Sequence, residues 1–334
     1  MDTTNPDTMR AIVHTAYGPP DVLELRRIAK PVVTDDGVLV RIHAASVNAG
    51  DWHLMRGSPF FIRFMLGGLF KPGRLVPGCA MAGRVEAVGR KVTRFRPGDE
   101  VFGDLSESGF GAFAEYVCAP EHALAHKPAN VGFEAAAAVP VAALAALQGL
   151  RDCGRIQAGH KVLVLGASGG FGSFAVQIAK SCGAEVTGVC GTDRIDLLRA
   201  LGADHVIDRT RQDVTRDGRH YDLILDAAAF RPLRDYLRIL TPGGRYVMVG
   251  GSTPRFMLAL LFGGLISRFA RRSVKCLASR PNPADMDTLK EMLESGRIVP
   301  VIDRRYELAE TPAAIRRLEQ RQVRGKVVIT MARQ

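Results

Sequence analysis

The sequence lacks the patterns that mark metal-binding, exported and membrane-spanning chains. Its six cysteines contain no Cys-x-x-Cys pair, and no zinc-finger spacing is present. Widely spaced cysteines in a chain of this size are typical of reduced, structural thiols, which indicates a cytoplasmic protein. Residues Met1–Arg10 are polar and hold no apolar core of an export signal, so we expect no export.

Long apolar runs are missing as well. The closest, Phe256–Ile266, has about 11 residues, whereas a membrane span needs about 20. The net charge of +11 would suit nucleic acid, acidic lipid or an anionic ligand. The arginines are scattered, however, apart from doublets such as Arg26-Arg27, and no aromatic-basic RNA signature is present. We therefore expect neither a membrane span nor nucleic-acid binding.

What the sequence does contain suits two domains, because 334 residues exceed one ordinary core. The first third has the pattern of short β-strands separated by turn residues such as Arg96-Pro97-Gly98-Asp99. This pattern predicts a compact, barrel-like, mostly-β domain. The expected strands are Arg10–His14, Gly37–Ala45, Gly83–Val88, Glu100–Phe102 and Ala114–Ala119.

The pattern changes near residue 130. An alanine-rich helix is expected over Phe133–Leu150, interrupted by Pro140. Apolar strands then alternate with helices, which predicts an α/β domain with a doubly wound, buried parallel sheet. Its expected strands are Lys161–Leu165, Glu185–Cys190, His205–Ile207, Tyr221–Asp226 and Arg245–Val249, and its expected helices are Ser173–Ser181, Arg194–Leu201 and Arg231–Leu240. Towards the end we expect helices Ala284–Ser295 and Ala309–Arg321, an extended segment Val299–Ile302 and a strand Lys326–Thr330.

A glycine-rich turn follows the strand Lys161–Leu165. Positions 167–172 have the form A-x-G-x-x-G, and a helix follows. In such a turn one glycine lets the backbone approach a pyrophosphate and a later one allows close packing of helix on strand, while the helix N-terminus offers free N–H groups. A simple connecting turn is the alternative. We predict dinucleotide contacts at Ala167, Ser168, Gly169, Gly170, Phe171 and Gly172.

The end of the second expected strand favours NADPH over NADH. A carboxylate there would bind the ribose 2′-hydroxyl and would repel a 2′-phosphate by about 4 kcal/mol at 4 Å and a dielectric of 20. Position 191 is glycine, followed by Thr192 as a donor and Arg194 as a cation. Arg209 could supply a second cation, whereas Asp193 is an unfavourable neighbour. Each arginine could instead be an ordinary surface charge.

These motifs together resemble a zinc-free medium-chain dehydrogenase/reductase of the quinone oxidoreductase type. The resemblance implies a GroES-like domain over residues 1–128, completed by 280–334, and a Rossmann domain over 129–279. It also implies a homodimer, and cofactor contacts at Gly250, Gly251, Ser252 and Lys326. The matching stretches are Met9–Gly18, Ser46–Trp52, Pro77–Gly89, Arg96–Gly103, Gly111–Val117, the glycine turn, Leu201–Asp208, Leu240–Gly250 and Arg324–Ile329.

The ligands of a catalytic zinc are not in place. Zinc-dependent relatives need Cys, His and Glu around the reacting carbonyl. Here the stretch Ser46–Asp51 has no cysteine, and Gly78-Cys79-Ala80 stands where those relatives have Gly-His-Glu. The four-cysteine structural lobe is missing, because Gly103–Gly111 connects directly. We therefore predict no metal.

Without a metal, a quinone or an α,β-unsaturated carbonyl is easier to reduce than a simple ketone. We assign Asn48 as the polar group nearest the substrate carbonyl, and Asp51 as the group that orients its loop or a water. Alternatively, Asn48 forms an Asx turn and Asp51 is the N-cap of a helix Trp52–Arg56. A zinc-independent alcohol or aldehyde reductase is a second hypothesis. A non-catalytic NADPH sensor or assembly factor is a third, because the family usually has Thr at the position of Ala145.

Two apolar segments with arginines remain, Pro59–Arg74 and Pro254–Arg272. They could line a pocket for a small lipophilic substrate between the domains. They could also form a dimer contact, or touch an anionic membrane surface as a peripheral contact. The remaining alternative is that they are ordinary core.

Overall fold

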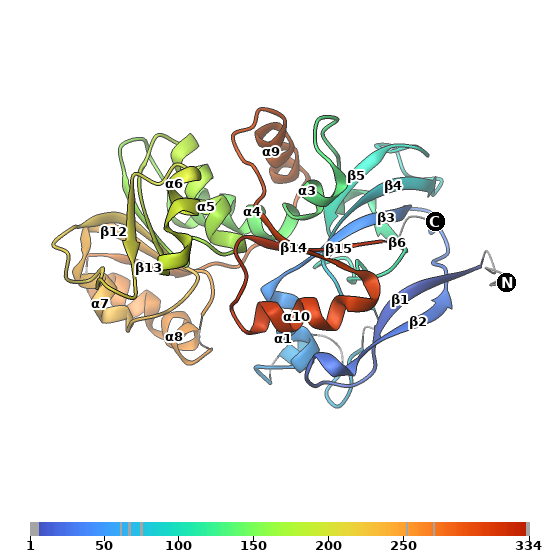
Figure 1. Ribbon diagram of the computed structural model, residues 1–334, viewed down its shortest axis with the longest axis horizontal. Coiled ribbons are helices and arrows are strands. Elements are labelled where there is room, and N and C mark those ends of the chain that lie inside the picture. Colours follow the sequence, from blue (N-terminus) through green and yellow to red (C-terminus); the bar gives the residue numbers. More distant parts are fainter. Residues whose placement is uncertain are drawn as a thin grey trace. The chain divides into compact units, whose positions relative to one another are not determined.

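The computed structural model describes residues 7–60, 62–65, 68–73, 76–251, 253–269 and 271–331. The chain divides into two compact units (Figure 1). Unit 1 consists of Met1–Val141, Pro281–Gly296 and Pro300–Gln334, and unit 2 of Ala142–Arg280 and Arg297–Val299. The first crossing between the units therefore falls at residues 141/142, whereas the sequence places a boundary at 128/129.

Unit 1 is built on a sheet with the strand order β14-β15-β3-β4-β5-β7, and β6 pairs with β3. β15, close to the end of the chain, runs antiparallel to β3 with Val327 opposite Val47, so strands far apart in sequence lie side by side (Figure 1). These strands are β3 (Gly37–Val47), β4 (Ala80–Val88), β5 (Glu100–Asp104), β6 (Tyr116–Pro120), β7 (Leu124–His126), β14 (Ile302–Glu307) and β15 (Lys326–Thr330), with a separate hairpin of β1 (Thr8–His14) and β2 (Leu23–Ala29).

The core of unit 1 draws on both ends of the chain. Ile12 from β1 belongs to the same buried cluster as Ile315 and Ile329. The late segments thus complete the first core instead of forming one of their own. The helices are α1 (Ala49–Arg56), α2 (Ile62–Met65), α3 (Phe133–Ala137), α9 (Pro283–Glu294) and α10 (Thr311–Glu319), with short 3-10 turns at Pro20–Val22, Glu121–Ala123 and Leu308–Glu310.

Unit 2 is a parallel sheet with the strand order β10-β9-β8-β11-β12-β13. Numbered within the unit this order is 3-2-1-4-5-6, the arrangement of dinucleotide-binding domains. The predicted α/β class, with a doubly wound parallel sheet beside a mostly-β part, agrees with this strand order. The strands are β8 (Lys161–Leu165), β9 (Glu185–Cys190), β10 (His205–Asp208), β11 (Tyr221–Asp226), β12 (Leu240–Met248) and β13 (Ser273–Cys276).

The helices of unit 2 include one that crosses from unit 1. The predicted helix Phe133–Leu150 is broken before Pro140 into α3 and α4 (Pro140–Gln148), and a π-helical turn, Gly149–Cys153, follows α4. The other helices are α5 (Gly170–Ser181), α6 (Ile195–Ala200), α7 (Leu233–Arg238) and α8 (Thr253–Phe269), with a 3-10 turn at Thr192–Arg194. None of the described helices has the length and apolar character that crossing a membrane requires.

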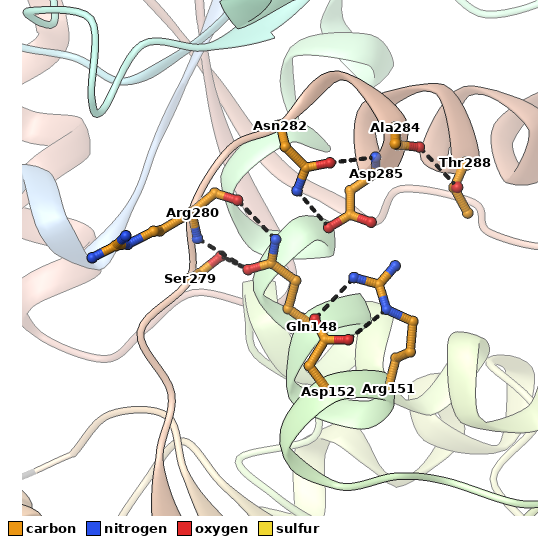
Figure 2. Close-up of polar contacts among 9 residues, drawn as sticks. All are labelled: Gln148, Arg151, Asp152, Ser279, Arg280, Asn282, Ala284, Asp285 and Thr288. Atoms are coloured by element: carbon orange, nitrogen blue, oxygen red, sulfur yellow. Dashed lines mark hydrogen bonds and ion pairs between the residues drawn. The ribbon is translucent and has the colours of Figure 1, made fainter.

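Two carboxamides fix the chain where it leaves β13 and where α9 begins (Figure 2). In unit 2 the Gln148 side-chain oxygen accepts from the Ser279 hydroxyl and the Arg280 amide, both at 3.0 Å. Its nitrogen donates to the Arg280 carbonyl oxygen at 2.7 Å. In unit 1 Asn282 is the N-cap of α9 and accepts from the Asp285 amide at 2.9 Å. Because Pro283 occupies the first turn, the start of this helix is fixed by its sequence.

Candidate functional site

A tight turn joins β8 to α5 at the carboxyl end of the unit 2 strands. Gly166 has a φ of 76°, and Gly169 is the N-cap of α5. The Gly169 amide donates to the Gly166 carbonyl oxygen at 3.0 Å and closes the turn. The first turn of α5 contains no acidic residue, and the positive end of a helix favours an anion.

The glycines of this turn serve different purposes. A Cβ at Gly172 would lie 2.3 Å from the Gly166 oxygen and 2.5 Å from the Ala167 Cα, so packing of the helix on the turn requires glycine there. A Cβ at Gly169 would meet only the Gly166 oxygen, at 3.4 Å. The fold itself therefore tolerates a side chain at 169. The free space above Gly169 fits the close approach of a pyrophosphate.

The edge formed by β9 and β10 contains the residues expected to distinguish NADPH from NADH. Arg194 donates to the Ser168 hydroxyl at 3.4 Å, which connects this edge with the glycine turn. Thr192 donates its hydroxyl to Asp208 at 2.6 Å. That hydrogen bond, with others from Thr210, lowers the pKa of the Asp208 carboxyl. The expected donor Thr192 is thus engaged with a carboxylate that the sequence analysis did not single out.

Arg209 lies beside a cavity of about 240 Å³ on the same unit. Its guanidinium stacks on the ring of Phe230, 4.9 Å from the ring centroid. Leu165 and Val189, at the carboxyl ends of β8 and β9, also line the cavity. A cavity at this edge of a doubly wound sheet is where such folds bind ligands.

Gly250 and Gly251 follow β12, beside the loop that leaves β11. The Gly250 amide donates to the Asp226 carbonyl oxygen at 3.3 Å. Gly251 has a φ of 115°, and a Cβ there would lie 2.4 Å from that of Ala229, so glycine is required. The third expected contact on this loop, Ser252, lies outside the described residues.

Asn48 and Asp51 begin helix α1 in unit 1. Asn48 is the N-cap, with φ −126° and ψ 159°, and its backbone N–H donates to the Asp51 carboxylate at 2.7 Å. The alternative that Asp51 caps a helix Trp52–Arg56 is therefore wrong, since α1 starts at Ala49. Asp51 is its third residue and serves the capping box from within the helix.

Around these two residues lies a buried polar cluster that we call the Lys326 cluster: Asn48, Asp51, Cys79, Asp104 and Lys326. Each member is at most 6 % exposed. The Lys326 ammonium donates to the Asn48 side-chain oxygen, and the Cys79 thiol donates to Asp51 at 3.3 Å. Both oxygens of Asp51 thus accept hydrogen bonds, as an ionised carboxylate can.

Burial governs the protonation of this cluster. It raises the pKa of Asp51 to about 6, against the hydrogen bonds from Asn48 and Cys79. It lowers the pKa of Lys326 to about 8, although Asp51, Cys79 and Asp104 favour the ammonium. Burial also raises the pKa of Cys79 and of Asp104. pKa values shifted by burial together with a specific charged partner are typical of functional sites.

Comparisons with known proteins match both parts of the chain. Residues 34–129 match the alcohol dehydrogenase GroES-like domain, and residues 201–329 match a family described as zinc-binding dehydrogenase. The 2-methylene-furan-3-one reductase of Solanum lycopersicum is 33 % identical, over 97 % of this chain and 79 % of that protein. The chain belongs to the medium-chain dehydrogenase/reductase family.

Two further proteins similar to this chain are also oxidoreductases by name. The chloroplastic NADPH-dependent alkenal/one oxidoreductase of Arabidopsis thaliana is 31 % identical, over 98 % of this chain and 81 % of that protein. The structure of the quinone oxidoreductase from Coxiella burnetii has a TM-score of 0.85 and 27 % identity, and the match covers 97 % of this chain and 100 % of that one. The protein is an NAD(P)H-dependent oxidoreductase, which confirms the predicted family and enzyme class. A cytoplasmic location and a homodimer stay predictions.

The predicted absence of a metal stays a prediction, and the structure places Cys79, the one candidate ligand of the Gly78-Cys79-Ala80 stretch, in the Lys326 cluster. Among the described residues, no group of three or more His, Cys, Asp or Glu side chains is placed to hold a metal ion. Cys79 and Asp51 do meet, but the thiol is protonated and donates to the carboxylate. The positive charge that the cluster contains is the Lys326 ammonium.

The two apolar segments each expose several apolar side chains, although Ala259 of the second belongs to a buried cluster against which Phe256 and Ile266 pack. In Pro59–Arg74 the described Phe60, Phe64 and Phe70 are 57 %, 66 % and 89 % exposed. In Pro254–Arg272 the large apolar side chains that are exposed, among those described, are Leu258, Leu260, Leu261 and Phe262 on α8. Ordinary core is therefore the wrong explanation for these seven side chains. Phe61, Leu66, Gly67, Arg74 and Ala270 lie outside the described residues.

A pair of glycine variants separates the two purposes of the turn. We expect Gly172→Ala to lower the free energy of unfolding by about 1–3 kcal/mol, because its Cβ would overlap backbone atoms. Gly169→Ala should leave stability within about 0.5 kcal/mol but weaken binding of the reduced dinucleotide. Denaturant unfolding and fluorescence titration measure the two effects.

Gly264→Ala on α8 is the control, because nothing lies within 4 Å of a Cβ there. It should not lower stability, since alanine is the better helix former. Full dinucleotide affinity in Gly169→Ala would contradict the assignment of this turn.

Proposed function

We propose that the protein is an NADPH-dependent reductase of quinones or α,β-unsaturated carbonyl compounds that needs no metal ion. The observation that carries the proposal is the buried Asn48 carboxamide, whose oxygen accepts from the buried Lys326 ammonium, while the described residues hold no cluster of metal ligands. A bound dihydronicotinamide supplies the hydride, while the protein supplies position and electrostatics.

Within the described residues, Asn48 has one side-chain donor without a partner, which we assign to a substrate. One N–H of its carboxamide donates to the Ser46 carbonyl oxygen at 2.9 Å, and its oxygen accepts from Lys326. The second N–H is directed to a substrate carbonyl oxygen, on which negative charge develops when hydride adds to the conjugated carbon. Because conjugation spreads this charge, one hydrogen bond suffices where a simple ketone would need a Lewis acid.

The cofactor is NADPH. Position 191 is glycine, so the end of β9 presents no carboxylate at the place where NAD-specific folds bind the 2′-hydroxyl. Arg194, anchored at the turn by its contact with Ser168, supplies the cation for the 2′-phosphate, and Arg209 supplies a second. Asp193 lies 3.6 Å from Arg194 and partly offsets its charge. The names of the relatives from Solanum lycopersicum and Arabidopsis thaliana support an enone-type acceptor.

A substrate panel tests the proposed reaction. Enzyme treated with a chelator and freed of metal should oxidise NADPH with quinones and enones, and should be much slower with saturated ketones. The absorbance at 340 nm reports the rate, and elemental analysis reports the metal content. Activity that returns only on addition of zinc would contradict metal independence. Tight NADPH binding with no turnover of any compound would favour the sensor hypothesis instead.

Arg194→Ala tests the choice of cofactor. A charged hydrogen bond contributes about 1.5–3 kcal/mol, so we expect the KM for NADPH to rise by about tenfold or more, with little change for NADH. Arg199→Ala is the matched control, because that arginine is 68 % exposed and pairs with Asp196. Equal losses with both dinucleotides would show that Arg194 does not bind the 2′-phosphate.

Asn48→Ala tests the substrate contact. Loss of one donor to a developing oxyanion costs about 100-fold in kcat, and we expect a loss of at least about tenfold in kcat/KM here. Asn130→Ala in the same unit is the control, since that side chain bonds only the Glu294 carbonyl oxygen among the described residues. Unchanged kinetics in Asn48→Ala would remove Asn48 from the reaction.

A further inference from the structure

We propose that Lys326 is the positioning residue of the catalytic site, fixing the Asn48 carboxamide through a buried ammonium instead of contacting substrate itself. This inference rests on the proposed function. It assigns to Lys326 a role different from the cofactor contact that the family resemblance implies.

Strand register brings Lys326 to Asn48. Val327 of β15 pairs with Val47 of β3, so the residues next to this pair, 326 and 48, also meet. The Lys326 ammonium donates to the Val47 carbonyl oxygen at 3.2 Å and to the Asn48 side-chain oxygen. These two contacts use two of the three ammonium donors inside unit 1. Lys326 itself is only 3 % exposed.

This contact decides which way the carboxamide faces. An ammonium only donates, so it selects the oxygen of Asn48 and leaves the nitrogen on the opposite side. That nitrogen donates one hydrogen to the Ser46 carbonyl oxygen. The other hydrogen has no partner in the described part of the chain, which leaves one donor in a fixed direction. Without the ammonium, the carboxamide could rotate and present its oxygen to a substrate oxygen.

The surrounding charges keep Lys326 protonated. Asp51 on α1, Asp104 at the end of β5 and Cys79 before β4 all act electrostatically on Lys326. Glu107 acts on the cluster through Asp104. Two carboxylates around one ammonium hold its proton against the cost of burial. Asp51 in turn fixes the Asn48 backbone amide at 2.7 Å, so backbone and side chain of Asn48 are held by opposite charges.

The arrangement requires Asp51 ionised and Lys326 protonated at once. Burial raises the pKa of Asp51 to about 6 and lowers that of Lys326 to about 8. Activity should therefore fall on the acid side as Asp51 gains a proton and on the alkaline side as Lys326 loses one. The two limbs belong to the cluster as a coupled set.

Lys326→Met and Lys326→Arg test the proposal through kcat, KM, the NADPH dissociation constant and the pH profile. For Lys326→Met we expect kcat to fall by up to about 100-fold, the scale of a misplaced reacting group, with NADPH affinity within about twofold. Its alkaline limb should vanish and its acid limb should move to higher pH, because Asp51 loses its counter-charge. Lys326→Arg should regain part of kcat and shift the alkaline limb upward, since a guanidinium stays charged.

Lys127→Met is the matched control. Lys127 is also buried in unit 1, at 9 % exposure, and pairs with Glu100 at 2.9 Å outside the cluster. Lys127→Met should lower stability but leave both limbs of the pH profile in place. A loss of stability alone would then not explain the profile of Lys326→Met. If Lys326→Met does not fold, the alkaline limb of Lys326→Arg decides alone.

The wild-type rate separates the two proposals. If wild-type enzyme reduces no quinone or enone, the proposed function fails before Lys326 is tested. If wild-type enzyme is active and the Lys326 variants keep its kcat and its pH limbs, the positioning role is wrong. Weaker NADPH binding with unchanged kcat would also overturn it, and would assign Lys326 to the cofactor.

Discussion

The antiparallel pairing of β15 with β3 is the interaction on which the Lys326 cluster depends. It carries a lysine from near the end of the chain to the loop at residue 48. Without that cation, Asp51 and Asp104 would be buried with no positive partner in their cluster, a costly arrangement. With it, the cluster is a preorganised set of donors and charges. In the proposed reaction the late segments of the chain contribute to the chemistry as well as to the core.

The glycine turn of unit 2, in contrast, is determined by local sequence. It needs only a buried strand, a helix start and glycines at the right spacing, all contiguous in sequence. The observed strands β8, β9 and β11 have the predicted bounds, because continuous apolar runs flanked by turns define them. Position 169 is glycine although the protein's own packing would tolerate a side chain there, and the proposed approach of a pyrophosphate gives a reason for it.

Features set by distant pairing could not be predicted. Cys79 was considered only as a metal ligand, and Asp104 was not singled out, since its burial depends on how β4 and β5 pack. The helix start was misplaced at Asp51 because Asn48 and Asp51 are both good capping residues and local sequence does not choose between them. β13 was missed, since a short strand after the apolar α8 has no pattern of its own. β2 was missed as well, since its burial pattern is mostly exposed.

The most direct test of the central claim is a crystal structure with NADP⁺ and an unreactive quinone or enone analogue. We expect the pyrophosphate over residues 169–172, and the carbonyl oxygen of the analogue within hydrogen-bond distance of the Asn48 nitrogen. We also expect Lys326 to bind the Asn48 oxygen and no metal ion to be present. A carbonyl oxygen bound to a metal, or to any group other than Asn48, would contradict it.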